Sequence, residues 1–199
     1  NPLAHRQALA AFLGTLADAD DGVTYTTSFS QTGVGGIVYQ GTEAGSPVWG
    51  YYRFQLPSNI PAGAVIKKVQ LRLYGRDVSA AWATNYLVIR GQNSANAGAV
   101  TAANQTPGTV GTGVPLVSTT ANWVAPALVW KLDDWNESVD AKSIVSQIVS
   151  NQSGLANGAY IQLWLTRGDS TVSTSTLVVG SEDTTYETIN HAQLLIEWE

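Results

Sequence analysis

The stretch Trp49 to Gly75, WGYYRFQLPSNIPAGAVIKKVQLRLYG, decides the fold. Its second half alternates between apolar and polar side chains, with Val69, Leu71 and Leu73 set against Lys68, Gln70 and Arg72. This alternation predicts a strand with one face in a core and the other in water, as is typical of antiparallel sheets. The first half, Trp49 to Leu56, predicts another strand that ends at Pro57, and turn residues separate the two.

Similar short strands continue along the chain. They are expected at Tyr86 to Arg90, Ile161 to Leu165, Leu177 to Val179 and Leu194 to Trp198. Apolar residues at helical spacing predict one short helix over residues 140–151, closed by Gly154. Residues 93–120 are read as a functional loop or a pair of short edge strands. We therefore expect a mainly β fold, an antiparallel jelly-roll β-sandwich with this helix and a short N-terminal one.

The N-terminal helix is expected from about Ala4 to Leu16. Leu9, Phe12, Leu13 and Leu16 form one apolar stripe at helical spacing. A lone helix this short is marginal in water, so the stripe must dock on its own domain or on another chain. We divide the chain into a docking segment, residues 1–22, and a jelly-roll domain, residues 23–199.

The composition limits the classes of partner. The 199 residues include 15 acidic and 10 basic ones, which gives a net charge of −5 and argues against a general nucleic-acid binder. No apolar run approaches the roughly 20 residues that span a bilayer, so no membrane partner is expected. The absence of Cys excludes disulfides, Cys-ligated zinc and thiol catalysis.

Catalytic motifs are not found. The two histidines, His5 and His191, have neither metal-binding nor triad spacing, and the chain carries no phosphate loop or nucleophile elbow. Paired carboxylates could come from Asp77, Asp133, Asp134, Asp169, Glu182, Asp183 and Glu187. Solvated loop acids are the favoured explanation. We expect no enzyme and no cofactor; bound calcium stays open, with no calcium-loop motif to support it.

Aromatic residues are the other candidates for a site. Four tryptophans lie in or beside expected loops, where a ring could contact a glycan or a neighbouring subunit: Trp82, Trp123, Trp130 and Trp135. The alternative for each is a core or loop-covering role, which most tryptophans in a sandwich have. Trp164 is expected to cover a second layer or a helix. If their strands pair, one sheet would also carry a polar and aromatic patch of Gln70, Arg72, Tyr86, Arg90, Gln162 and Trp164.

The stretch from Trp49 to Gly75 resembles the Phe-x-Leu…Ile-Pro-x-Gly-Ala-x-Ile segment of DNRLRE-type β-sandwich domains. Later blocks follow in the same order: Arg90 to Ala97, Trp123 to Pro126, DAKSIVSQIVSNQSGLANG and the closing HAQLLIEWE. The resemblance covers about residues 36–199. It implies a jelly roll similar to carbohydrate-binding modules, of a kind found in secreted, cell-surface and phage virion proteins. It supplies no binding residue that can be transferred.

The opening NPLAHRQALAAFLGTLADADDG resembles the start of small phage structural proteins. With no signal segment at the start of the sequence given, we expect a phage virion component, a capsid decoration or tail-associated protein. Its partners would be other virion proteins and further copies of itself, and surface glycans are a further option. The alternative is a carbohydrate-binding module outside the cell or at its surface. A small glycosidase or lyase is the least favoured reading.

Overall fold

The computed structural model describes residues 13–14, 21–24, 29–30, 37–43, 46–78, 87–101, 114–123, 131–167, 176–182 and 191–199. Within these ranges the chain forms twelve strands and one helix. They are β1 (Leu13–Gly14), β2 (Asp21–Thr24), β3 (Phe29–Ser30), β4 (Ile37–Glu43), β5 (Ser46–Gln55), β6 (Ile66–Val78), β7 (Leu87–Gln92), β8 (Leu116–Trp123), β9 (Trp135–Glu137), α1 (Lys142–Gln152), β10 (Tyr160–Arg167), β11 (Thr176–Glu182) and β12 (Gln193–Trp198). The expected mainly β fold is confirmed.

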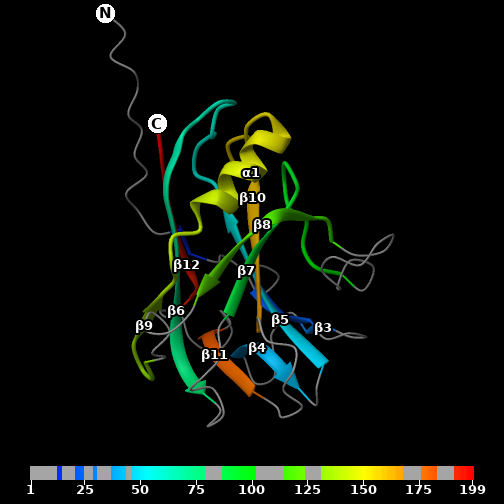
Figure 1. The fold of residues 1–199 in the computed structure, drawn as a ribbon, viewed down its shortest axis with the longest axis vertical. Helices are drawn as coiled ribbons and strands as arrows, with labels where there is room; N and C mark the ends of the chain where they lie inside the picture. Colours follow the sequence, from blue (N-terminus) through cyan, green and yellow to red (C-terminus); the bar gives the residue numbers. More distant parts are fainter. Residues whose placement is uncertain are drawn as a thin grey trace, which may run out of the picture.

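The strands form two layers that are joined at one end. In the first layer β6 lies between β12 and β9, and β1 extends the edge of β12. The second layer has the order β5-β10-β7-β8, with β2 and β3 beside β5. Strands β11 and β4 connect β6 to β5 at the end opposite α1 (Figure 1). Every pairing among these strands is antiparallel.

The main core lies between the two layers. Val69, Leu71 and Leu73 of β6 are fully buried in it, as the alternation predicted. Ile161 and Leu163 of β10 reach the same core from the second layer. Burial of these side chains removes apolar area from water, which is the dominant favourable term in folding.

Helix α1 closes the core at one end of the sandwich (Figure 1). Its buried face consists of Ile144, Val145, Ile148 and Val149, so the helix predicted over residues 140–151 is confirmed with a shift of one or two residues. After the helix, Ser153 is left-handed at φ 56°, and Gly154 follows with φ 100°. Within the described ranges, no helix is long and apolar enough to cross a bilayer.

A second, smaller apolar cluster covers the outer face of β5 and β10. Trp164 and Tyr51 meet there with ring centroids 5.4 Å apart, and Val100 and Val114 pack over them. Trp164 is fully buried, but the residues that pack over it, Val100 and Val114, lie outside the named strands and α1, so in the described part of the chain neither a second layer nor a helix covers it. Residues 93–101 and Val114 contribute to this cover, residues 102–113 lie outside the described residues, and residues 116–120 belong to the edge strand β8.

Two sheet edges flank α1, and side chains satisfy their backbone groups. On β6, the backbone N–H of Leu71 donates to Ser138 Oγ and that of Val69 donates to Asp140 Oδ1, each at 3.0 Å. On β8, the N–H of Thr119 donates to Oε1 of Gln147 at 2.9 Å. Residues 138–147 therefore cover the end of the sandwich between β6 and β8. The backbone groups that they occupy on these two strands are not open to pairing with other chains.

The N-terminal segment joins the sheet at β1, where Leu13 and Gly14 pair with Leu194 and Gln193. The helix expected from Ala4 to Leu16 is therefore wrong at these two residues, because pairing with the edge of β12 holds them extended. The rest of that segment lies outside the described residues. The boundary expected between residues 22 and 23 falls inside β2, which pairs with β5.

Candidate functional site

A polar and aromatic surface lies on the outer face of the first layer. Because Val69, Leu71 and Leu73 point into the core, the residues between them point outward. The pairing of β9 with β6 then places Trp135 opposite Tyr74 and Glu137 opposite Arg72. On the other side of β6, Gln193 of β12 stands opposite Arg72. We call this surface the Trp135 patch: Gln70, Arg72, Tyr74, Trp135, Glu137 and Gln193.

Contacts within the Trp135 patch fix its side chains. The guanidinium of Arg72 lies 4.9 Å from the centroid of the Trp135 ring, and Tyr74 meets the same ring edge-on at 5.6 Å. Arg72 Nε also forms an ion pair with Glu137 Oε1 at 3.2 Å, and Arg72 Nη1 donates a hydrogen bond to Gln193 Oε1 at 3.2 Å. These contacts hold the half-buried Trp135 ring in one orientation over the sheet.

The carboxylate of Glu137 is used on both oxygens. Oε1 faces Arg72, and Oε2 accepts a hydrogen bond from Gln70 Nε2 at 3.2 Å. Its side chain is 49% exposed, so solvent screens the pair with Arg72. Through these two contacts the Glu137 carboxylate orients the side chains of Arg72 and Gln70. The patch therefore presents an aromatic ring bordered by amide, guanidinium and carboxylate groups.

The other predicted tryptophans have different outcomes. Trp123 is fully buried in the main core, so its predicted role as a glycan or subunit contact is wrong. It ends β8, and the alternation of that strand turns its ring inward. Trp82 and Trp130 lie outside the described residues. Only Trp135 of the four is a surface candidate in the described part of the chain.

The polar patch expected on one sheet is divided between two layers. Gln70 and Arg72 lie on β6, whereas Arg90, Gln162 and Trp164 lie on β7 and β10 of the other layer. Tyr86 lies outside the described residues. Gln162 and Trp164 are also buried beneath the small cluster, so they offer no open surface.

Of the predicted docking residues, the structure describes only Leu13. Its side chain is half-buried and packs against the main core of its own chain. Leu9, Phe12 and Leu16 lie outside the described residues, so docking through them stays a prediction. Leu13 cannot be counted as a free contact for a partner.

The acids gather in no metal site in the part of the chain that the structure describes. Asp133 and Asp134 are exposed, and Asp134 accepts a hydrogen bond from the backbone N–H of Trp135 at 2.7 Å. Asp77 and Glu182 belong to β6 and β11. Asp169, Asp183, Glu187 and His5 lie outside the described residues. His191 is half-buried just before β12.

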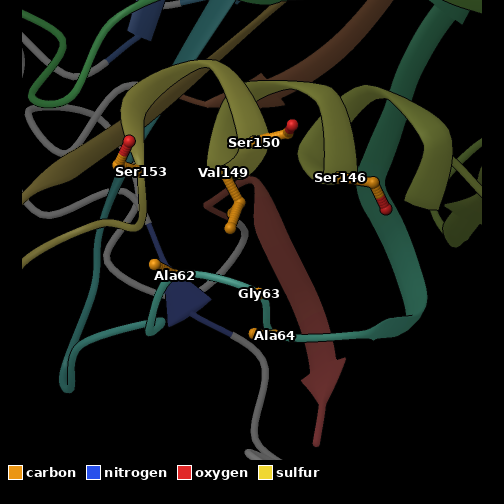
Figure 2. Close-up of a pocket in the computed structure, with 7 residues that line it drawn as sticks. All are labelled: Ala62, Gly63, Ala64, Ser146, Val149, Ser150 and Ser153. Atoms are coloured by element: carbon orange, nitrogen blue, oxygen red, sulfur yellow. The ribbon is translucent and has the colours of Figure 1, made fainter.

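A small pocket of about 230 Å³ lies between α1 and the turn before β6 (Figure 2). Its lining consists of small side chains without a titratable group: Ala62, Gly63, Ala64, Ser146, Val149, Ser150 and Ser153. This pocket has no signal in the sequence, because small residues on a helix surface carry no distinctive chemistry. The lining suits no catalytic step.

Sequence reasoning missed three members of the Trp135 patch, Tyr74, Glu137 and Gln193. The alternation of β6 was enough to point Tyr74 outward, but the pairing of β9 beside it had no signal in the sequence. No protein-family model matches the chain, and no curated protein is similar enough to count as a relative. The resemblances to DNRLRE-type domains and to phage structural proteins therefore stay predictions.

Proposed function

We propose that this chain is a non-enzymatic structural and adhesion protein, a phage virion component that decorates a capsid or tail. In this proposal the N-terminal segment attaches the protein, and a jelly-roll sandwich is displayed outward. The resemblance of the first 22 residues to phage structural proteins motivates the virion assignment.

One observation supports attachment: the described part of the N-terminal segment pairs with an edge strand. Leu13 and Gly14 pair with the first two residues of β12, at an edge of the first layer. These two residues therefore lie at a sheet edge. A segment at an edge can bind a neighbour through backbone hydrogen bonds and a few apolar anchors.

The experiment compares two double variants of the full chain. Leu9→Ser with Phe12→Ser removes two apolar residues of the docking stripe, while Leu13 is left intact because it packs in the core. Val65→Ser with Leu132→Ser is the matched control, since both residues are 52% exposed on the body. Each protein is quantified by mass spectrometry in purified particles of the virus that encodes it.

We expect the original chain and the control to co-purify with particles, and the stripe variant to fall at least about tenfold, the cost of roughly 1.4 kcal/mol in binding. Circular dichroism should show the same folded spectrum for all three. Equal incorporation of both variants would contradict docking through the stripe. Absence of the original chain from the particles would contradict the virion assignment.

A carbohydrate-binding module is the second candidate, and the Trp135 patch favours it. The ring of Trp135 is oriented by Arg72 and Tyr74 and bordered by amide and carboxylate groups. The test is binding to a glycan array, with Trp135→Ala compared against Trp123→Phe, which keeps an aromatic ring in the core. Loss of binding in Trp135→Ala alone would support this function, and no binding by the original chain would exclude it for the glycans tested.

A further inference from the structure

Asn157 and Gly158 form the one Asn-Gly pair in the sequence. They lie between α1 and β10, in a turn over residues 156–159 that a hydrogen bond from the N–H of Ala159 to the carbonyl of Ala156 closes at 3.2 Å. Gly158 has φ 78°, in the left-handed region that favours glycine at the third position of a turn. The pair is therefore fixed in a defined backbone conformation.

The backbone nitrogen of Gly158 is placed next to a side chain that it can attack. Bonding of this nitrogen to Cγ of Asn157 closes a five-membered ring, and asparagine is among the thermolabile residues for this reason. Glycine crowds its own nitrogen least, because it has no side chain. An added Cβ at Gly158 would meet only Nε2 of Gln55, at 3.8 Å, so the ring has room to form.

The amide of Asn157 is not held in place by its surroundings. The residue is exposed, and none of the described residues forms a hydrogen bond with its side chain. By contrast, Asn93 and Asn96 accept hydrogen bonds from Nε2 of Gln152 and from the backbone N–H of Tyr160, each at 2.9 Å. The side chain of Asn157 is therefore free to rotate towards the backbone.

Hydrogen bonds to the end of β5 restrain the attacking nitrogen. The N–H of Gly158 donates to the carbonyl of Leu56 at 2.9 Å, and Nε2 of Gln55 donates to the carbonyl of Gly158 at 3.2 Å. The N–H of Leu56 in turn donates to the carbonyl of Ala159 at 2.8 Å. The nitrogen must lose its proton to attack, so the turn has to open locally before the reaction starts.

We propose that Asn157 is a site of spontaneous deamidation whose rate is set by the hydrogen bonds between its turn and the end of β5. When the turn opens, the nitrogen of Gly158 bonds to Cγ of Asn157 and the bond from Cγ to Nδ2 breaks. The leaving amide group takes up the proton of the Gly158 N–H and departs as ammonia. One water molecule then opens the ring: cleavage between nitrogen and Cγ gives aspartate, and cleavage between nitrogen and the main-chain carbonyl carbon gives isoaspartate.

Both products change the molecule. Each adds a negative charge to a chain whose net charge is already −5. Isoaspartate also leads the main chain through Cβ, which lengthens a turn whose hydrogen bonds to Leu56 depend on its length. We expect this product to loosen the pairing of Tyr160 with Gln55, the pair at the end of β5 and the start of β10. This modification does not depend on the proposed function.

The experiment follows each asparagine of the full chain over time. One sample is kept folded in mildly alkaline buffer and a second is unfolded in urea at the same pH. Peptide mass spectrometry measures the mass increase that replacement of an amide by a carboxyl group causes. We expect Asn157 to convert before every other asparagine in both samples, and at least about tenfold faster in urea, which corresponds to roughly 1.4 kcal/mol of opening free energy.

Three variants separate the chemistry from the restraint. Asn157→Gln keeps an amide but needs a larger ring, so position 157 should stay unmodified. Gln55→Ala removes the hydrogen bond to the carbonyl of Gly158 and should speed conversion in the folded chain about two- to tenfold, with no change in urea. Gln147→Ala is the matched control, because it removes a hydrogen bond to β8 instead and should leave the rate unchanged.

The outcomes are separable. If Asn157 converts no faster than the other asparagines in either sample, the modification site is wrong. Equal rates in the folded and unfolded chain, or the same effect of Gln55→Ala and Gln147→Ala, would overturn the control by the turn's hydrogen bonds.

Discussion

Gly91 shows at the scale of one residue how tightly α1 packs on the second layer. A Cβ added at this position would lie 2.5 Å from Cγ2 of Ile144 and 2.8 Å from Cδ1 of Ile148. Both side chains are buried in the main core, so neither can move without disturbing the packing around it. We predict that Gly91→Ala lowers the free energy of unfolding by about 1–3 kcal/mol, the usual cost of overpacking, as measured by urea denaturation.

Gly98 provides the control for this substitution. It lies in the loop that covers the small cluster, and no atom would come within 4 Å of an added Cβ. Gly98→Ala should change the stability by less than about 0.5 kcal/mol. Equal effects of the two substitutions would show that α1 does not pack on β7 as described.

Trp123 and Trp135 form a second contrast at residue scale. Trp123→Ala should cost about 3–5 kcal/mol, because it opens a cavity in the main core. Trp135→Ala should cost only about 1 kcal/mol, since the ring is half-buried and loses mainly its contacts with Arg72 and Tyr74. Thermal and urea unfolding measure both effects. Similar losses for the two would contradict the placement of Trp135 on the surface.

This contrast shows that the sequence alone did not predict which of the two tryptophans is buried. Both tryptophans stand near expected loops, so the same two alternatives applied to each. The difference lies in the face of the sheet to which each ring points. Alternation along β8 turns Trp123 inward, whereas β9 pairs beside β6 and carries Trp135 on the outer face. A strand of three residues such as β9 has too few positions for periodicity to reveal it.

At the scale of elements, residues 138–141 replace a missing strand along β6. We predict that Asp140→Ala lowers stability by about 1–3 kcal/mol, because Oδ1 accepts hydrogen bonds from the N–H groups of both Val69 and Lys142. Asp140→Asn keeps an oxygen at this position and should lose less than half as much. If the two variants are equally destabilised, the acceptor role of Asp140 is wrong, and urea titration of both decides.

The two helical patterns, over residues 4–16 and 140–151, had different outcomes for a physical reason. The apolar stripe of α1 packs into the main core, and the helix contacts both β6 and β8. The stripe at Leu9, Phe12 and Leu13 is equally helical in spacing. Leu13 is nevertheless held in a strand, because the adjacent edge of β12 supplies hydrogen bonds that a lone short helix cannot match.

At the scale of the whole molecule, the joined layers predict a gradient of local stability. Strand β10 is paired on both sides and covered on both faces, and Ile161 to Leu165 are all buried. Strand β1 lies at the end of the strand order and pairs at two residues only. Local opening costs least where few contacts are broken, so amide exchange should be slowest in β10 and much faster at Leu13 and Gly14.

Hydrogen exchange followed by mass spectrometry or NMR measures this gradient and also tests how the layers are coupled. Because β6 and β5 are linked through β11 and β4, we expect the inner strands β6, β5 and β10 to open only by global unfolding, and hence to share one limiting free energy. The same free energy should come from urea titration. A lower free energy of exchange in β6 and β12 than in β5 and β10 would contradict this expectation. The two layers would then unfold as separate cooperative units despite their connection through β4 and β11.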